Sequence, residues 1–286
     1  MAKAVPSRSK GSSPITEPIW IRWGLIFLAA IFLGLFLFLP LLSIFMNAFQ
    51  RGIHIYLASF KEQDALAAIR LTLLASMVAL ILNLLFGLSA AWAIGKFDFR
   101  GKSLLSSIID LPFSISPVVA GVIYIIIYGR QGWLGPFFLK HNVQIIFAVP
   151  GIVLATLFVT FPFVTRAILP LMEEQGRQQE EAAMVLGASG WRTFFSVTLP
   201  NIKWALLYGL VLCNARAMGE FGAVSVVSGH IRGQTNTVPL YIEILYNEYN
   251  FTAAFAISTL LTFLALVTLA AKAILEWKSA WRRSTF

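Results

Sequence analysis

Residues 173–201 read EEQGRQQEEAAMVLGASGWRTFFSVTLPN and connect two long apolar stretches. Ala183 and Gly187 are four residues apart, so a helix here would present both on one small face that another surface can approach closely. Gly187 and Gly190 permit a sharp turn because glycine adopts positive φ at little cost. The apolar periodicity of residues 191–197 predicts a second short helix near the membrane surface. We expect the first of these two helices to be exposed and to dock against another protein.

The apolar stretches around this connection are long enough to cross a membrane. The chain is 58% hydrophobic and 12% charged, whereas about a quarter of the residues of an average soluble domain are charged. Roughly 20 helical residues cross a hydrocarbon core. Backbone amides in lipid must form their hydrogen bonds within the protein, and apolar runs of this length do so as helices. We therefore predict an all-α membrane protein. Its six predicted transmembrane helices are residues 20–46, 69–95, 104–128, 145–170, 202–227 and 253–274, with Leu199 and Pro200 opening the fifth.

The two ends of the chain are predicted to be tails. Residues 20–46 are too long for the core of a signal peptide and no small-residue cleavage site follows them, so we keep them as a true span. Residues 1–19 are rich in Ser, Pro and Lys and predict a disordered cytoplasmic tail. Residues 276–286 are predicted to form a second cytoplasmic tail.

The distribution of Lys and Arg predicts the orientation of the chain. With the N-terminus in the cytoplasm, 14 of the 22 basic residues lie in cytoplasmic segments, 6 lie outside, and Arg166 and Arg216 lie within spans. Because cytoplasmic loops carry an excess of Lys and Arg, both termini are predicted to be cytoplasmic and residues 229–250 to face outward. The formal charge of +9 then reflects membrane orientation, and we expect no nucleic-acid partner.

The 173–201 segment resembles the EAA loop of ABC importer permeases. The pattern of that loop is Glu-Ala-Ala, three residues, Gly, nine residues, Ile, any residue, Leu-Pro. The resemblance implies a type I ABC importer permease fold over residues 66–275, in which the loop at 171–200 is a coupling helix seated in a groove of an ATPase subunit. ATP and Mg²⁺ would be bound by that ATPase, with no cofactor, metal or catalytic residue on this chain. The matching positions are Glu181, Ala182, Ala183, Gly187, Leu199 and Pro200, with Val197 at the Ile position.

Three further stretches are similar to the sulfate and molybdate permeases of this family. They are DLPFSISPVVAG from Asp110, NARAMGEFGA from Asn214, and GHIRGQTNTVPL from Gly229, which runs on through YIEILY. The last stretch favours sulfate, with thiosulfate, molybdate or phosphate as alternatives. The resemblance implies import across the plasma (inner) membrane of a bacterium. Implied partners are two copies of the ATPase, a homologous permease completing a heterodimer, a periplasmic sulfate-binding protein and the lipid bilayer.

Four charged residues fall within the predicted spans: Asp110, Arg166, Arg216 and Glu220. Ionisable groups in a bilayer are costly and are functional by default. Arg216 and Glu220 are one helical turn apart and can form an ion pair. One interpretation is that the pair only fixes helix packing. The alternative is that Arg216, which can bind two oxygens at once, helps to attract a dianion. Near the cytoplasmic ends of spans three and four, Asp110 and Arg166 are expected to pair, with a role in a gate as the alternative.

Two prolines, Pro112 and Pro117, interrupt the third predicted span. Proline removes a helix hydrogen bond and clashes with the preceding turn, so we expect a kink. The freed backbone groups would bond to neighbouring helices or line a water-filled cavity.

Two other classes of membrane protein fit the sequence less well. An ion-coupled secondary transporter would accommodate six spans with buried charges, but it would leave the docking loop unexplained, and we see no inverted repeat. A membrane-embedded enzyme would need a catalytic constellation, and no HExxH, GxSxG or Walker lysine motif occurs. The single cysteine, Cys213, has no partner for an intrachain disulfide. The sequence therefore favours a permease driven by a separate ATPase.

Overall fold

The computed structural model describes residues 18–283, with side chains described as far as residue 276. Every regular element in that range is helical, which confirms the all-α prediction. Five helices are long and apolar enough to cross a membrane, and one sharply bent pair makes a sixth if it is counted as a single span. The predicted N-terminal tail, residues 1–19, falls almost entirely outside the described residues, whereas residues 276–283 of the predicted C-terminal tail continue the last helix.

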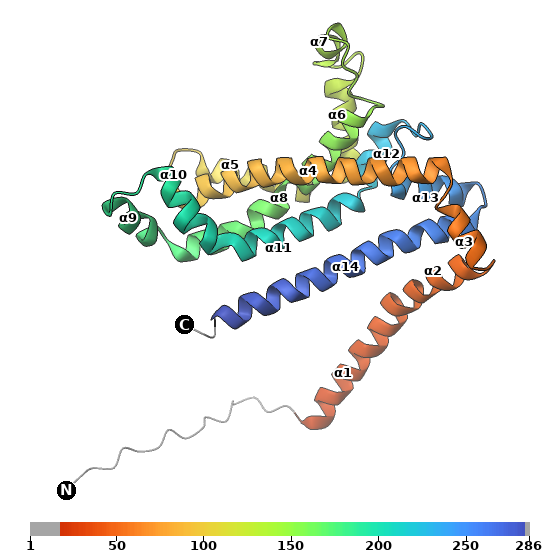
Figure 1. Ribbon diagram of the computed structural model, residues 1–286, viewed down its shortest axis with the longest axis horizontal. Helices are drawn as coiled ribbons and strands as arrows, with labels where there is room; N and C mark the ends of the chain where they lie inside the picture. The colour runs from red at the N-terminus through yellow and green to blue at the C-terminus, as the bar shows by residue number, and fades with distance from the viewer. Residues whose placement is uncertain (1–17, 284–286) are drawn as a thin grey trace.

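Three long helices, α4, α8 and α11, form the centre of the molecule, and the other elements lie around them (Figure 1). In chain order the elements are α1 (Ile19–Leu33), the π-helical turn η1 (Gly34–Phe38), α2 (Leu39–Phe49), α3 (Ile53–Ser59), α4 (Gln63–Lys96), α5 (Lys102–Ser114), α6 (Pro117–Tyr128), α7 (Gly135–Lys140), α8 (Val149–Gln175), α9 (Gln178–Val185), α10 (Gly190–Thr193), the π-helical turn η2 (Phe194–Thr198), α11 (Leu199–Met218), α12 (Gly222–Ser228), α13 (Val238–Asn247) and α14 (Phe251–Arg283).

Small residues bring the three central helices close together. A Cβ added to Gly87 of α4 would lie 3.0 Å from Val164 Cβ of α8, and one added to Gly209 of α11 would lie 2.8 Å from Ala167 Cβ. Thr165 Oγ1 also donates a hydrogen bond to the Gly87 carbonyl (3.2 Å). Lipid tails are as apolar as the helices, so this close approach and the interhelical hydrogen bonds supply the packing energy.

Asn83 joins the same three helices through polar contacts. Its side chain is fully buried, and Nδ2 donates to Thr160 Oγ1 of α8 (2.7 Å) and contacts Cys213 Sγ of α11 (3.4 Å). Thr160 Oγ1 in turn donates to the carbonyl of Thr156 (2.6 Å). Such polar contacts between membrane helices contribute about 0.6–2 kcal/mol each, and they hold the three helices at one relative height.

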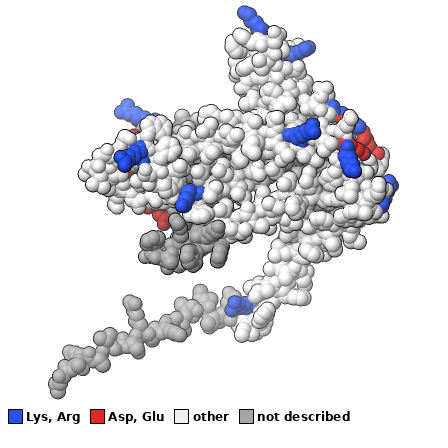
Figure 2. All heavy atoms as spheres, in the orientation of Figure 1, with Lys and Arg blue, Asp and Glu red and all other residues white. Residues whose placement is uncertain are grey.

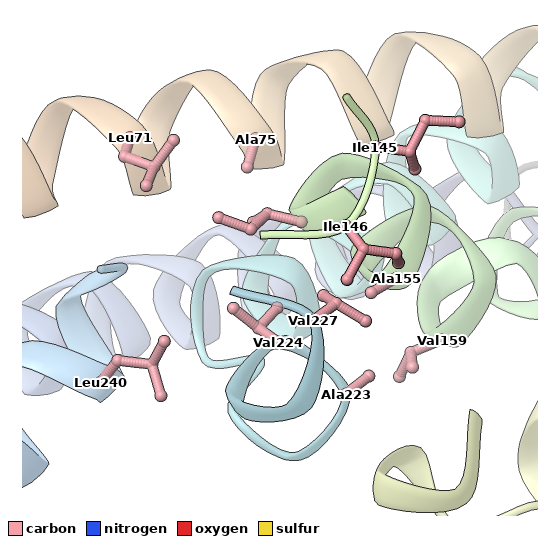
Figure 3. Close-up of a cluster of buried hydrophobic side chains, with 11 residues drawn as sticks. Leu71, Ala75, Ile145, Ile146, Ala155, Val159, Ala223, Val224, Val227 and Leu240 are labelled. Carbon is pink, nitrogen blue, oxygen red and sulfur yellow. The ribbon is translucent and has the colours of Figure 1, made fainter. Parts of the chain in front are cut away.

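A cluster of buried apolar side chains closes one end of the bundle (Figure 3). Leu71 of α4 and Ile146, from the stretch before α8, pack with Val224 and Val227 of α12. The Phe147 N–H donates to the Val227 carbonyl (2.8 Å). The loop before α8 is therefore part of the core at this end.

The second and fourth helices differ in extent from the predicted spans. α4 adds about a turn and a half before residue 69, and α8 begins at Val149, later than the predicted residue 145. Pro150 occupies the first turn of α8, where its missing N–H costs nothing. The helix then continues past Pro170 and ends at Gly176, whose φ of 64° no longer fits a helix.

The third predicted span is two helices, so a single helix over residues 104–128 is wrong. The axes of α5 and α6 differ by 110°. The break lies at Ile115 and Ser116, which are extended because the residue before a proline, here Pro117, avoids the helical conformation. Pro112 stays inside α5. The predicted kink is therefore a complete break, and it lies at the second proline.

After this break α6 packs against α12. A Cβ on Gly121 would lie 2.8 Å from the Ala223 carbonyl, and one on Gly222 would lie 3.1 Å from Pro117 Cβ. Together with α7, α6 projects from the bundle (Figure 1).

The fifth predicted span is also corrected. α10, η2 and α11 form one continuous helix over Gly190–Met218, so the predicted separate helix at 191–197 is the beginning of this span. The π-helical turn η2 ends two residues before Pro200, and η1 stands in the same relation to Pro40. A proline ring displaces the carbonyl four residues earlier, and a π turn accommodates that displacement. The helix stops at Gly219, so α12 is a separate short helix.

The first and last helices lie outside the central bundle. α2 packs along α14, and the Tyr56 hydroxyl of α3 hydrogen-bonds Thr259 Oγ1 of α14 (2.9 Å). α1 extends away from the bundle and buries none of its residues (Figure 1). The spans Ile19–Phe49 and Phe251–Glu276 enclose the predicted ranges 20–46 and 253–274.

The charge distribution agrees with a membrane protein. On the face drawn in Figure 2, Lys and Arg gather toward the two ends of the bundle and at the tip of the α6–α7 projection, and the long middle carries few charges. A largely uncharged middle suits a hydrocarbon core.

Candidate coupling site

The end of α9 is closed by a left-handed glycine. Gly187 has a φ of 89°, its N–H donates to the Met184 carbonyl (2.9 Å), and the Ala188 N–H donates to the Ala183 carbonyl (3.0 Å). This pair of bonds is the Schellman motif, which satisfies carbonyls at a helix end and favours glycine at the left-handed position. The spacing of Gly187 from the Glu-Ala-Ala triplet thus has a backbone cause. Because Gly187 lies beyond the helix, the predicted small face shared with Ala183 is wrong.

Large apolar side chains are exposed at this end of α9. Val185 is 87% exposed and Leu186 is 88% exposed, and Met184 beside them is half exposed. No residue of α9 is buried. Solvent-exposed apolar groups clustered in a polar connection are typical of a protein interaction site.

The six residues of the EAA pattern do not share one surface. Leu199 and Pro200 lie within the continuous helix of the fifth span, away from the exposed end of α9. Glu181, Ala182 and Gly187 are exposed and Ala183 is half-buried. The exposed end of α9, residues 184–187, is called the α9 tip below.

The first turn of α9 is anchored by an ion pair that is largely shielded from solvent. Lys96 Nζ, at the end of α4, lies 2.8 Å from Glu180 Oε1, and the two side chains are 5% and 13% exposed. Lys96 Nζ also donates to the Gly176 carbonyl at the end of α8 (2.5 Å). Thr198 Oγ1 of η2 donates to the same Glu180 oxygen (3.1 Å). Four segments therefore meet at this ion pair, which we call the Lys96–Glu180 joint.

Two exposed contacts hold the same turn. Arg177 lies 2.7 Å from Asp98, just beyond the end of α4, and Asn201 Nδ2 donates to Gln179 Oε1 (2.5 Å). Both are more exposed than the joint, so solvent weakens them.

Neither member of the joint stood out in the sequence. Lys96 contributed only to the count of cytoplasmic charges, and Glu180 lies next to the matched triplet without belonging to it. A lysine at the C-terminal end of a span and a glutamate in the first turn of the next cytoplasmic helix each suit the local helix dipole. That shared preference is the one signal that could have drawn attention to them.

Arg216 and Glu220 form the ion pair that their spacing predicts. Arg216 Nη1 lies 2.6 Å from Glu220 Oε2, and the two side chains are 34% and 1% exposed. Glu220 sits in the break between α11 and α12, where Oε1 accepts a hydrogen bond from the Ala223 N–H (2.9 Å). The glutamate is therefore a buried structural acceptor, and the arginine remains partly accessible.

Asp110 and Arg166 face each other across α5 and α8. Arg166 Nε donates to Asp110 Oδ1 (2.6 Å) and a second bond joins Arg166 Nη2 to Asp110 Oδ2. The arrangement is bidentate, the stronger geometry for an arginine and a carboxylate. About half of the arginine side chain is exposed.

The opposite end of the bundle carries a hydrogen bond between α13 and the residue before α4. Tyr241 donates its hydroxyl to Glu62 Oε2 (2.7 Å). Burial, and then this bond, raise the pKa of the Tyr241 phenol above its usual value. The stretch predicted to face outward, residues 229–250, is thus a partly helical segment packed on α4.

The chain matches a family of transport proteins over residues 83–278, the family described as "Binding-protein-dependent transport system inner membrane component". The chain belongs to this family. It is therefore a transport subunit of the inner membrane, as predicted, and the alternatives of a secondary transporter and a membrane-embedded enzyme are set aside.

Among named relatives, the chain is similar to the sulfate transport system permease protein CysW of Escherichia coli (strain K12). The two are 47% identical over 278 residues, which cover 97% of this chain and 94% of the relative. It is 35% identical over 239 residues to the sulfate transport system permease protein CysT of the same organism, covering 84% of this chain and 86% of the relative.

A solved structure shares the fold. It is a chain of a bacterial alginate ABC transporter in complex with an alginate pentasaccharide-bound periplasmic protein, with a TM-score of 0.74 and 18% identity over 90% of this chain and 92% of that chain. The architecture is thus that of an ABC transporter chain.

Proposed function

We propose that this chain is the membrane permease of an ATP-driven sulfate importer. The observation that carries the proposal is the α9 tip: an apolar end, closed by a left-handed glycine, exposed on an otherwise polar connection. Such an end suits a groove on an ATPase subunit, because burying two or three apolar side chains there would remove them from water.

Sulfate is the proposed substrate because the chain is similar to two sulfate permeases over most of its length. The chain is 47% identical to CysW and 35% identical to CysT, two distinct sulfate permeases of one organism. The presence of two such permeases favours a heterodimer of this permease with a homologous CysT-like partner. A periplasmic sulfate-binding protein would deliver the anion to the pair, and two copies of the ATPase would bind ATP and Mg²⁺.

The orientation proposed is the one that the basic residues predict, with both termini in the cytoplasm. The α9 tip then faces the ATPase. Residues 229–250, at the other end of α4, then face the binding protein.

For the intramembrane charges we propose mainly structural roles. Both oxygens of Glu220 are engaged inside the bundle, and Asp110 binds Arg166 through both of its oxygens. The accessible part of Arg216 leaves contact with a passing anion as the competing role for that residue.

The test is reconstitution of the complete complex in proteoliposomes. ATPase activity and uptake of labelled anion are measured with binding protein loaded with sulfate, thiosulfate or molybdate. We expect stimulation and uptake with sulfate. Uptake of molybdate without sulfate would replace the proposed substrate, and stimulation with no uptake of any oxyanion would contradict the importer function.

A further inference from the structure

We propose that the Lys96–Glu180 joint carries movement of α9 to the membrane helices, which makes Lys96 and Glu180 positioning residues for the coupling of ATP hydrolysis to transport. The inference rests on the proposed function and deepens it, because it concerns how a force applied at the α9 tip reaches α4.

Packing alone does not hold α9 against the bundle. None of its residues is fully buried, and the apolar side chains at positions 184–186 of its tip are 52–88% exposed. A cleft of about 410 Å³ lies beside the helix, lined by residues that include Trp92, Phe97, Met184 and Phe194. A displacement of α9 can therefore reach the bundle through its two backbone connections and through the polar contacts of its first turn.

Among those contacts the joint is the most enclosed. The carboxylate of Glu180 receives both the ammonium of Lys96 and the hydroxyl of Thr198, and the ammonium also binds the Gly176 carbonyl. Charges shielded from water interact more strongly than exposed ones, and either charge alone would be left buried without compensation. The two side chains therefore move together.

The helix on the other side of the joint is the one best placed to spread the movement. Lys96 is the last residue of α4, and buried residues recur along α4 from Ala65 to Lys96. α4 packs along α8 and contacts α11 and α13. The backbone connects α9 directly to α8 and α10 only, so the links from the start of α9 to the end of α4 are the enclosed joint and the exposed pair Arg177–Asp98.

The neighbouring pair Arg177–Asp98 provides a matched control. It spans the same two segments, from the start of α9 to the end of α4, but both side chains are exposed, at 41% and 76%. Exposed ion pairs contribute little because water screens them. If any ion pair between α9 and the end of α4 were enough for coupling, removing either pair would reduce sulfate import per ATP to the same extent.

The experiment compares four complexes reconstituted with the ATPase, the partner permease and sulfate-loaded binding protein: the unaltered one, Lys96→Met/Glu180→Ala, Arg177→Met/Asp98→Ala, and Lys96→Arg. The first double variant leaves no buried charge unpaired, so the permease is expected to assemble. Measurements are ATPase co-purification, stimulated ATP hydrolysis, and sulfate imported per ATP hydrolysed.

We expect the joint variant to bind ATPase and hydrolyse ATP while importing at least about fivefold less sulfate per ATP, the lower end of typical couplings between two sites. The control pair and Lys96→Arg should stay within about twofold of the unaltered complex. Unchanged import per ATP in the joint variant would overturn the inference, and so would loss of ATPase binding in that variant alone, which would make the joint a mere support for α9. If the proposed docking itself is wrong, changes at the α9 tip will leave ATPase binding intact, a result independent of the joint.

Discussion

Glu220 accepts a hydrogen bond from the Ala223 N–H at 2.9 Å, so the carboxylate that pairs with Arg216 also holds the first turn of α12. This second bond changes how the pair must be tested. Replacing Glu220 with alanine would remove two contacts at once. A glutamine keeps a carbonyl oxygen for Ala223 and removes only the charge.

We expect Arg216→Met to lower the amount of assembled permease, because it leaves the buried Glu220 carboxylate unpaired and an unpaired buried charge costs about 3–5 kcal/mol. Glu220→Gln should lower it less, because the side chain of Arg216 is 34% exposed and keeps contact with water. The double variant Arg216→Met/Glu220→Gln should recover assembly and sulfate uptake to within about twofold. Assembly is measured by size-exclusion chromatography and uptake in proteoliposomes. A double variant that assembles normally but imports little sulfate would assign Arg216 to the anion pathway.

The left-handed conformation of Gly187 predicts a graded effect of substitution. Gly187→Ala should cost about 1–2 kcal/mol at the end of α9 and reduce ATPase co-purification and uptake by about 5- to 30-fold. Gly187→Asn should cost less, because asparagine tolerates this conformation. Gly190→Ala is the control, since Gly190 has no positive φ and an added Cβ meets open space. Equal effects at the two glycines would remove the backbone explanation.

The exposed side chains of the α9 tip predict a loss of affinity without a loss of folding. Val185→Ser/Leu186→Ser should weaken ATPase binding by about tenfold or more, because each apolar side chain buried in a groove contributes about 1.5–3 kcal/mol. Titration of purified ATPase onto permease in nanodiscs measures the change. Tyr249→Ser, at the other end of the bundle and 81% exposed, should leave the affinity unaltered. ATPase binding that survives at full strength in the tip variant would place the dock elsewhere.

Orientation is tested by labelling single cysteines. Replacing Cys213 with serine keeps a polar partner for Asn83, and exposed positions at opposite ends are then changed in turn to cysteine, Ser189→Cys near α9 and Gln234→Cys before α13. A membrane-impermeant maleimide added to intact cells with permeabilised outer membranes should label position 234 and spare position 189. The reverse pattern would invert the topology.

Much of this fold could be predicted because apolar length and charge placement are local properties of the chain. Stretches such as 69–95 and 253–274 needed no knowledge of their neighbours. The breaks were harder to predict, because Ile115 and Ser116 leave the helix before Pro117 whereas Pro112 is tolerated within α5. Gly219 and Glu220 end α11 inside an apolar run, where hydropathy alone shows no boundary.

The sequence predicted where the candidate coupling site lies, but it did not predict which contacts attach α9 to the bundle. The Glu-Ala-Ala triplet and Gly187 marked the connection, but the Schellman end of α9 depends on a φ value that the letters do not specify. The contact between Lys96 and Glu180 joins residues far apart in the chain. In the sequence, Lys96 is interpreted as an ordinary basic residue flanking a span. Pairing of this kind follows from how α4 and α8 end together, which only the assembled helices determine.

The polar contacts of Asn83 set the kind of motion that α4 can make. Asn83 and Lys96 lie on one helix, roughly 20 Å apart at 1.5 Å per residue. A slide of α4 along its axis would pull the Asn83 amide away from Thr160 and Cys213 inside hydrocarbon, where no water replaces them. A rotation about the level of Asn83 keeps those contacts while it displaces both ends of α4 in opposite directions. If the Lys96–Glu180 joint pulls the Lys96 end of α4 inward, a rotation of this kind would move the opposite end of α4 outward.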